Sequence, residues 1–310
     1  MKDHSRRQFL KSTLISGAAV ATGSINLLTP GNAFAADFPD VTVSFGSDAS
    51  QITKSAIEAL GGMQRFVKPG AKVVIKPNMS FSSPPEAASN TNPEVVREVA
   101  RLCEQAGASR ISILDNTLRT PEDCLRMSRI PERCKDIPNT NVNYIKAHRL
   151  FKEVNVPNGK QLKTMEVATE VLDADVLIAV PVGKSHGASG VSLSMKGMMG
   201  LIYDRTSFHS RFDLHEAIVD MASVLKPALA VIDGTRILST GGPGGPGEVI
   251  PLNVVVASAD MVAADAQMVT LGTWYGKKFQ PNQVRHIKLA AERGLGIADL
   301  SALNVKTIKL

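Results

Sequence analysis

Short apolar runs rich in β-branched residues alternate with segments of helical periodicity along this chain, and that alternation restricts the folds open to it. The clearest strand is Val176–Val180, because five consecutive apolar residues require cover on both faces of a sheet. Strands that are joined through helices pair in parallel, since each helix returns the chain to the same end of the sheet. We therefore predict an α/β fold with a mainly parallel sheet and helices on both faces.

One α/β domain is expected to occupy residues 36–310, with an irregular insertion at about 116–170 that is rich in Pro, Asn and charged residues. Within the insertion only two weak strands are expected, at 143–145 and 154–156. The remaining predicted strands are 41–43, 72–75, 111–114, 176–180, 229–232, 252–257 and 305–308, and the predicted helices are 52–63, 93–106, 192–203, 214–225, 261–271 and 283–293.

The first 35 residues have the pattern of an export signal. Arg6 and Arg7 precede an apolar pair, a weakly apolar stretch follows at 12–28, and Ala-Phe-Ala at 33–35 supplies a small-x-small cleavage pattern. This order of features resembles a twin-arginine signal, which is an address read by a receptor. We expect the twin-arginine translocase as a partner and a periplasmic or otherwise exported location. An ordinary basic leader and an uncleaved membrane anchor remain the alternatives.

Composition excludes several classes of protein. Apolar residues make up 44% of the chain and charged residues 21%, which is typical of a globular protein and not of a disordered one. Half of the net charge of +6 lies in the first 35 residues, so we expect no nucleic-acid partner for the rest. No apolar run of 18 residues follows the leader, and we expect no stable membrane insertion after cleavage.

The three cysteines are Cys103, Cys124 and Cys134, and no two have C-x-x-C spacing. Three thiolates fall short of the four that an ordinary iron–sulfur cluster requires, so we expect no self-contained cluster. In an oxidising compartment, a disulfide between Cys124 and Cys134 and a pair of free thiols both remain open. The sequence identifies neither a metal nor an organic cofactor.

Polar side chains follow several of the predicted strands. Lys76 and Asn78 follow one strand, Asp115 follows the next, and Asp233 follows a later one. The carboxyl ends of parallel strands share one edge of a sheet, where open α/β proteins bind their ligands. We therefore predict these four as ligand-binding residues. A solvated lysine at Lys76, an Asx turn at Asp115 and a tight turn at Asp233 are the structural alternatives.

The glycine-rich segment 181–190 carries Lys184 and His186 and leads into a predicted helix with Ser192 and Lys196. Glycines allow the backbone to approach a ligand, and free amides at the helix N-terminus would add to the attraction of the lysines for an anion. His186 suits proton transfer or metal binding, although a purely structural hydrogen bond is the alternative. We predict His186, Lys184 and Lys196 as candidate catalytic residues.

The glycine- and proline-rich segment 241–247 follows the strand that ends near Asp233. Such a segment is predicted to form either a lid over the ligand site or a plain flexible surface loop.

A set of motifs occurs in a fixed order along the chain: Val74–Asn78, Asn92–Pro93, Glu104–Ala108, Val180–Gly187, Ser194–Lys196, Asp233–Gly234, Ala257–Asp260 and Ala264–Asp265. These ordered motifs resemble the domain of unknown function 362 family over roughly residues 70–296. The resemblance implies the α/β architecture but no settled activity. Members commonly have an asparagine after the lysine that matches Lys196, where this chain has Gly197, and some relatives carry a ferredoxin-like segment that this chain lacks.

Two functions remain open at this point. In the first, the exported protein holds a small carboxylate- or phosphate-bearing anion at the carboxyl edge of the sheet with Lys76, Lys184 and Lys196. An enzyme of this kind would use His186 as general acid or base, oriented by Asp115 or Asp233. In the second, the protein is a non-enzymatic binding or redox-accessory module that works with a separate iron–sulfur or metal partner.

Overall fold

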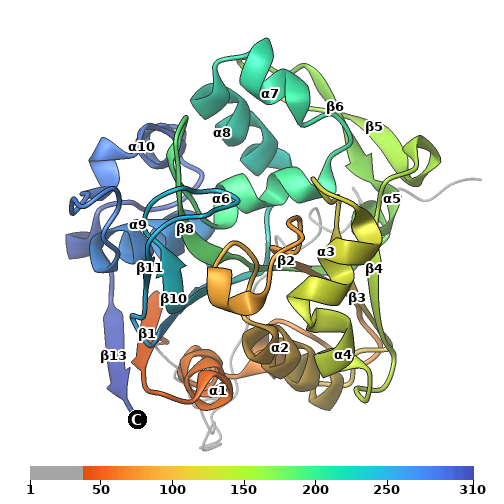
Figure 1. Cartoon of the computed structure of the whole chain (residues 1–310), viewed down its shortest axis with the longest axis vertical. Coiled ribbons are helices and arrows are strands. Elements are labelled where there is room, and N and C mark those ends of the chain that lie inside the picture. The colour runs from red at the N-terminus through yellow and green to blue at the C-terminus, as the bar shows by residue number, and fades with distance from the viewer. Residues whose placement is uncertain (1–37) are drawn as a thin grey trace, which may run out of the picture. The chain divides into compact units, whose positions relative to one another are not determined.

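Parallel strands form the centre of a large sheet (Figure 1). The computed structural model describes residues 38–310, so the predicted signal, with Arg6, Arg7 and the cleavage pattern at 33–35, lies outside the described residues. The strands are β1 (Val41–Phe45), β2 (Lys72–Pro77), β3 (Arg110–Asp115), β4 (Thr140–Tyr144), β5 (Phe151–Asn155), β6 (Thr164–Ala168), β7 (Val176–Val180), β8 (Val182–His186), β9 (Gly190–Ser192), β10 (Leu229–Leu238), β11 (Val249–Ile250), β12 (Val254–Ser258) and β13 (Val305–Lys309).

The main path through the sheet runs β13-β1-β12-β10-β7-β2-β3-β4. Neighbouring strands from β10 to β4 pair in parallel, whereas β12 is antiparallel to both β1 and β10. Strand β8 continues from β7 and pairs in parallel with β10. The prediction of a mainly parallel sheet is therefore confirmed.

Helices cover both faces of this sheet (Figure 1). Four of the six predicted helices form within two residues of the expected bounds, and the helix expected at 52–63 lies three to four residues earlier. The α-helices are α1 (Ala49–Ala59), α2 (Pro93–Gln105), α3 (Pro121–Ser128), α4 (Ile130–Cys134), α5 (Thr169–Leu172), α6 (Ser194–Gly197), α7 (Thr206–Ser210), α8 (Leu214–Val224), α9 (Met261–Leu271) and α10 (Arg285–Glu292).

The sheet separates two apolar layers, and alternate residues of each central strand enter different layers. In β2, Val73 and Ile75 pack with α1 and α2 on one side. Val74, between them, joins the layer that contains α8 and α9. The apolar runs of the central strands are buried on both faces for this reason, as expected of parallel strands.

Local sequence signals explain where the helices begin. Asn92 caps α2 by accepting a hydrogen bond of 3.1 Å from the Glu94 amide, and Pro93 occupies the first helical position. Asp260 caps α9 by accepting a hydrogen bond of 2.7 Å from the Val262 amide. Asn and Asp are preferred at this position because their side-chain oxygens accept hydrogen bonds from the first amides of a helix.

The predicted strand end at Asp233 is wrong, and the tight turn considered there as an alternative does not form, because β10 continues through this position to Leu238. Gly234 lies so close to Val254 that an added Cβ would come 2.7 Å from the Val254 side chain. The glycine therefore serves close packing between β10 and β12 instead of a turn.

The predicted helix at 192–203 is also wrong. Ser192 ends strand β9, α6 has four residues, and the chain continues as a 3-10 turn at Met198–Leu201. Gly197 and Gly200 lower the helix propensity of this segment by about 1 kcal/mol each relative to alanine, which favours the shorter elements.

The segment 116–170 is more regular than its composition predicts. It contains α3 and α4, strand β4 at the edge of the main sheet, and a separate two-stranded sheet of β5 and β6. Strand β4 has the sequence TNVNY and is mostly exposed or half-buried, so it carries no apolar run that would identify it. The two strands expected at 143–145 and 154–156 correspond to β4 and β5, and each begins three residues earlier than expected.

Within residues 38–310, none of the helices combines the length and the apolar character needed to cross a membrane.

Candidate functional site

Lys76 and Asp115 meet at the carboxyl ends of the parallel neighbours β2 and β3. Lys76 Nζ lies 3.2 Å from Asp115 Oδ1, and each side chain is 1% exposed. The other carboxylate oxygen, Oδ2, accepts hydrogen bonds from the Met79 amide at 2.9 Å and the Ser80 hydroxyl at 2.8 Å. Asp115 is thus fixed by the segment that follows β2 and neutralises one lysine.

Strand β8 brings Lys184 and His186 to the same edge of the sheet. Its start is held by Asn78, whose Oδ1 accepts a hydrogen bond of 3.0 Å from the Val182 amide. Because side chains alternate along a strand, Lys184 and His186 share one face of β8. The expected glycine-rich loop at 181–190 is therefore a strand followed by a turn, and strand geometry is what aligns these two side chains.

Lys196 lies on α6, whose first amides are not free. Asp265, from α9, accepts hydrogen bonds from the Ser194 amide at 2.7 Å and the Met195 amide at 3.0 Å. The expectation that these amides would bind an anion is therefore wrong. The first two amides of α6 are engaged by Asp265, which also fixes the helix that carries Lys196.

Six of the seven predicted site residues line one cavity of about 350 Å³, which we call the basic cavity. They are Lys76, Asn78, Asp115, Lys184, His186 and Lys196. The remaining lining residues are Ser80, Phe81, Leu118, Ser192, Gly197, Met199, Gly200, Arg205, Thr206, His209, Ser210 and Pro243.

Asp233 is the predicted residue that does not line the basic cavity. It is fully buried, and its carboxylate pairs with the Arg236 guanidinium and accepts hydrogen bonds from the Asn92 amide and from the amide and hydroxyl of Thr235. Because β10 does not turn at this residue, its side chain joins β10 to the start of α2. Asp233 has a structural role here.

Burial of several cations around one carboxylate lowers the pKa values of the lysines. Desolvation lowers the pKa of Lys184 to about 7 and that of Lys196 to about 7. The pKa of Lys76 is also lowered by desolvation, although Asp115 opposes the shift. Arg205 contributes a further positive charge and lowers the pKa of each lysine. Near neutral pH, both the amine and the ammonium forms of Lys184 and Lys196 are therefore accessible.

His186 is held by backbone amides and not by a carboxylate. Its Nδ1 accepts hydrogen bonds of 3.2 Å from the amides of Ala188 and Ser189, which assigns the proton of the neutral ring to Nε2. Desolvation first, and then the charge of Lys196, lowers the pKa of His186 to about 3. The expectation that Asp115 or Asp233 orients this ring is wrong, and His186 is a neutral hydrogen-bond donor at pH 7.

Sequence reasoning missed two ionisable residues that line the basic cavity, Arg205 and His209. Arg205 immediately precedes α7. Within residues 38–310, no acidic side chain forms an ion pair with Arg205 at 4.0 Å or less. The ring of His209 lies 5.6 Å from that of His186, centroid to centroid. Neither residue follows a strand or a glycine-rich motif, so the sequence contains no local signal for them.

The segment 241–247 lies against the basic cavity. The Gly242 amide donates a hydrogen bond of 3.0 Å to Ser185 Oγ, and Pro243 lines the cavity. Gly244 lies against the Phe81 ring, where an added Cβ would come 2.7 Å from a ring carbon. The segment is thus placed where a lid would be, and that role stays a prediction.

The part of the chain described by the structure contains no group of three or more His, Cys, Asp or Glu side chains placed to hold a metal ion. The three cysteines are buried free thiols, and burial raises the pKa of each. None of them lines the basic cavity.

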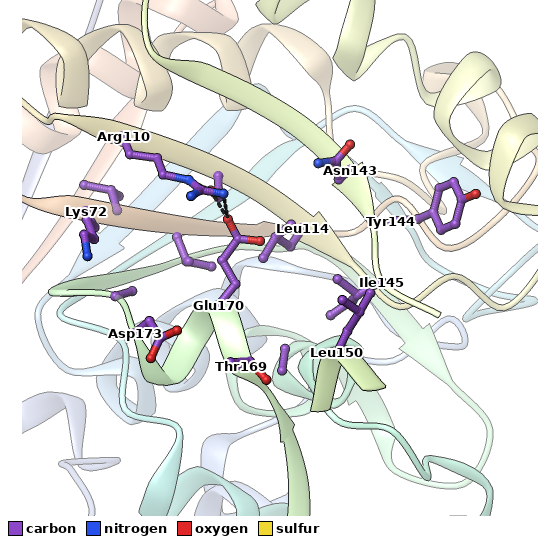
Figure 2. Close-up of a pocket in the computed structure, with 15 residues that line it drawn as sticks. Lys72, Arg110, Leu114, Asn143, Tyr144, Ile145, Leu150, Thr169, Glu170 and Asp173 are labelled. Carbon is purple, nitrogen blue, oxygen red and sulfur yellow. Dashed lines mark hydrogen bonds and ion pairs between the residues drawn. The ribbon is translucent and has the colours of Figure 1, made fainter. Parts of the chain in front are cut away.

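A second cavity, of about 410 Å³, lies beside the strands β2, β3 and β4 (Figure 2). Figure 2 shows Arg110 and Glu170 joined across it, and their side chains form an ion pair of 2.7 Å. The other charged residues that line it are Lys72 and Asp173. Its two basic and two acidic residues balance, so this cavity offers no excess charge to a ligand, in contrast to the basic cavity.

Comparison with known proteins adds two similar chains. Thylakoid-associated protein sll1697 of Synechocystis is 27% identical over 223 residues, which cover 68% of this chain and 66% of that relative, slightly less than two thirds of its length. The lactate racemase apoprotein of Thermoanaerobacterium thermosaccharolyticum aligns with a TM-score of 0.45 at 13% identity, over 74% of this chain and 57% of that chain.

The family comparison agrees with the motifs of the sequence. Residues 73–270 match the family model described as "Domain of unknown function (DUF362)". The matched region begins in β2 and ends in α9, so it includes every strand and helix that contributes to the basic cavity. The chain belongs to the DUF362 family.

Proposed function

We propose that this protein binds a small anion, bearing a carboxylate or a phosphate, in the basic cavity. The observation that carries the proposal is an imbalance of charge: Lys76, Lys184, Lys196 and Arg205 line the cavity with Asp115 as the acidic residue. The three lysines are 2% to 7% exposed. A buried cation without a counterion is unfavourable, and a bound anion would supply the missing charge.

The proposal assigns different tasks to these side chains. Lys76 is paired with Asp115, so Lys184, Lys196 and Arg205 are left to bind the anion. His186, as a neutral donor through Nε2, adds a hydrogen bond to an oxygen of the ligand. In an enzymatic reaction, the amines of Lys184 and Lys196 are the groups suited to accept and return a proton near neutral pH.

The proposal is tested by calorimetric titration of the purified protein with phosphate and with malonate. We expect binding by the unchanged protein and at least about a tenfold loss of affinity in Lys184→Met, because a charge-assisted hydrogen bond contributes about 1.5–3 kcal/mol. Lys226→Met, at an exposed lysine outside the cavity, is the matched control and should bind normally. Equal affinities in the two variants, or no binding of any anion, would refute the proposal.

A second measurement identifies the natural ligand. Protein purified under mild conditions is analysed by mass spectrometry for small molecules and by elemental analysis for metals. An anionic compound present in the unchanged protein and depleted in Lys184→Met supports the proposal. A stoichiometric metal with no anionic compound would favour a different kind of site.

We also propose that the protein is exported by the twin-arginine translocase. The order of the arginine pair, the weakly apolar stretch and the cleavage pattern supports this, and the thylakoid-associated relative fits an exported or membrane-associated location. Replacing both Arg6 and Arg7 by lysine keeps the charge and removes the motif. We expect the unchanged chain in the periplasmic fraction, shortened by its signal, and the double variant at full length in the cytoplasm. Equal export of both chains would contradict the proposal.

A further inference from the structure

Among residues 38–310, no oxygen atom accepts a hydrogen bond from the amine of Lys196, so its charged form lacks that stabilisation. Lys76 Nζ donates to the Pro77 carbonyl and pairs with Asp115, and Lys184 Nζ donates to the Ser89 carbonyl at 2.6 Å. In contrast, the hydrogen bond recorded for Lys196 Nζ is to Met199 Sδ, at 3.4 Å. A thioether is a weak hydrogen-bond acceptor, so hydrogen bonding stabilises the ammonium form of Lys196 less than that of Lys76 or Lys184.

The surroundings of Lys196 favour the neutral amine further. The side chain is buried to 93%, and Arg205 and His186 line the same cavity. Asp115, the acidic side chain of the cavity, is engaged by Lys76 and by the segment that follows β2. Desolvation and the charge of Arg205 account for the lowered pKa of Lys196. A neutral primary amine in a cavity is a nucleophile, and a lysine desolvated beside another cation is the usual way to obtain one.

The cavity also holds groups suited to the two ends of a particular ligand. Arg205 lines the cavity and forms no ion pair with an acidic side chain of residues 38–310. Its planar guanidinium is suited to bind a carboxylate through two parallel hydrogen bonds. His186 presents a donor at Nε2, which suits a carbonyl oxygen. A carboxylate next to a carbonyl matches both.

We propose that Lys196 forms an imine with the carbonyl carbon of a small 2-oxo carboxylate that Arg205 and Lys184 hold in the basic cavity. This inference rests on the proposed function and names the class of ligand. It also gives Lys196 a task that Lys76 and Lys184 cannot share, since both of their ammonium groups are bound to oxygen atoms.

The reaction balances without an oxidant or a reductant. The lone pair of the Lys196 amine forms a bond to the carbonyl carbon, and the carbonyl oxygen takes up a proton to give a carbinolamine. The nitrogen lone pair then expels the hydroxyl group, which leaves as water after it accepts a second proton. One of the amine protons is lost to solvent and the other stays on the nitrogen, so the product is a protonated imine and one molecule of water.

The position of Lys196 is well defined enough for such a reaction. Asp265 holds the first two amides of α6, and the residues on either side of Lys196, Met195 and Gly197, are buried. A nucleophile held on a fixed helix loses little freedom when it reacts, which is how proximity lowers a barrier.

The imine is tested by reductive trapping on the intact, purified protein. The protein is incubated at pH 7 with 2-oxobutyrate and sodium cyanoborohydride, and the products are examined by intact mass and peptide mapping. We expect a gain of one 2-oxobutyrate less one oxygen atom, on Lys196. Lys196→Arg, which keeps the charge but lacks the primary amine, should lose the adduct, and Lys226→Arg, at an exposed lysine outside the cavity, should keep it.

A second ligand separates this inference from the proposed function. 2-Hydroxybutyrate has the same carboxylate but no carbonyl, and its binding is followed by calorimetry. Binding of both acids without an adduct on Lys196 would overturn the imine and leave the anion site standing. Binding of neither acid would overturn both.

If Lys196→Arg fails to fold, the inference is tested on the unchanged protein alone, by comparing the extent of modification at Lys196 with that at exposed lysines. Lys226 is exposed and lies outside the basic cavity, so it serves as the internal comparison for reaction at pH 7. Modification concentrated on Lys196 supports the inference. Modification spread evenly over Lys226 and other exposed lysines contradicts it.

Discussion

At the scale of single residues, Gly200 is the position where the basic cavity depends most on the absence of a side chain. Its backbone lies directly against the ion pair of Lys76 and Asp115, and its carbonyl accepts a hydrogen bond of 2.8 Å from the Asn116 amide. An added Cβ would overlap both Asp115 Oδ1 and Lys76 Cε. Gly200 therefore allows the 3-10 turn after α6 to form the wall of the cavity.

Gly200→Ala is expected to destabilise the protein by about 1–3 kcal/mol, the usual cost of inserting a methyl group into a filled interior. It should also weaken anion binding, because Lys76 or Asp115 must move. The free energy of unfolding in urea and calorimetric titration measure the two effects. Gly187→Ala, where an added Cβ has nothing within 4 Å, is the control and should be as stable as the unchanged protein. Equal stability of the two variants would contradict this account of Gly200.

At the scale of elements, the link between α9 and α6 positions Lys196. Asp265 is fully buried and spans the two helices with its hydrogen bonds to the Ser194 and Met195 amides. Desolvation raises the pKa of Asp265 to about 7. The exposed residue Asp48 caps α1 in a comparable way, with two amides, of Ser50 and Gln51, bound to its carboxylate.

Asp265→Ala is expected to cost at least about 2 kcal/mol of stability, because two buried amides lose their acceptor and water cannot replace it. Asp48→Ala should cost about 1 kcal/mol, the usual value for an exposed cap, since its amides bind water instead. Urea unfolding of both variants at pH 8 measures the difference. An effect of Asp265→Ala no larger than that of Asp48→Ala would show that this link is unimportant.

The elements also show how far the sequence alone determines the site. Lys76 and Asp115 were predicted correctly to converge because each follows an apolar strand and adjacent parallel strands end together. Asp233 carried the same signal and failed, because an Asp-Gly pair fits both a turn and a closely packed strand. Arg205 carried no signal, since its position depends on tertiary packing of the short elements that follow α6.

At the scale of the whole molecule, the buried lysines should make stability depend on pH. Lysine in the unfolded chain keeps its proton up to about pH 10.4, whereas Lys184 and Lys196 in the folded protein lose theirs at about 7. Between these values unfolding takes up protons, so raising the pH favours the folded state. The direction is opposite to that of an exposed ion pair formed by a lysine.

We therefore expect the ligand-free protein to become more stable between pH 7 and pH 9, by at most about 1.4 kcal/mol per pH unit for each of the two lysines. Urea unfolding at pH 7, 8 and 9, in buffers without phosphate or carboxylates, measures the slope. The double variant Lys184→Met, Lys196→Met should have a flatter profile. A flat or falling profile in the unchanged protein would contradict the assignment.

The central claim is that the buried amines of the basic cavity bind an anion in their protonated form. It is tested most directly by calorimetric titration with malonate at pH 8 in two buffers with different heats of ionisation. We predict that binding takes up protons from the buffer, because the anion raises the pKa values of Lys184 and Lys196, and that the uptake falls in Lys196→Met. Absence of binding, or binding without any uptake of protons, would contradict the claim.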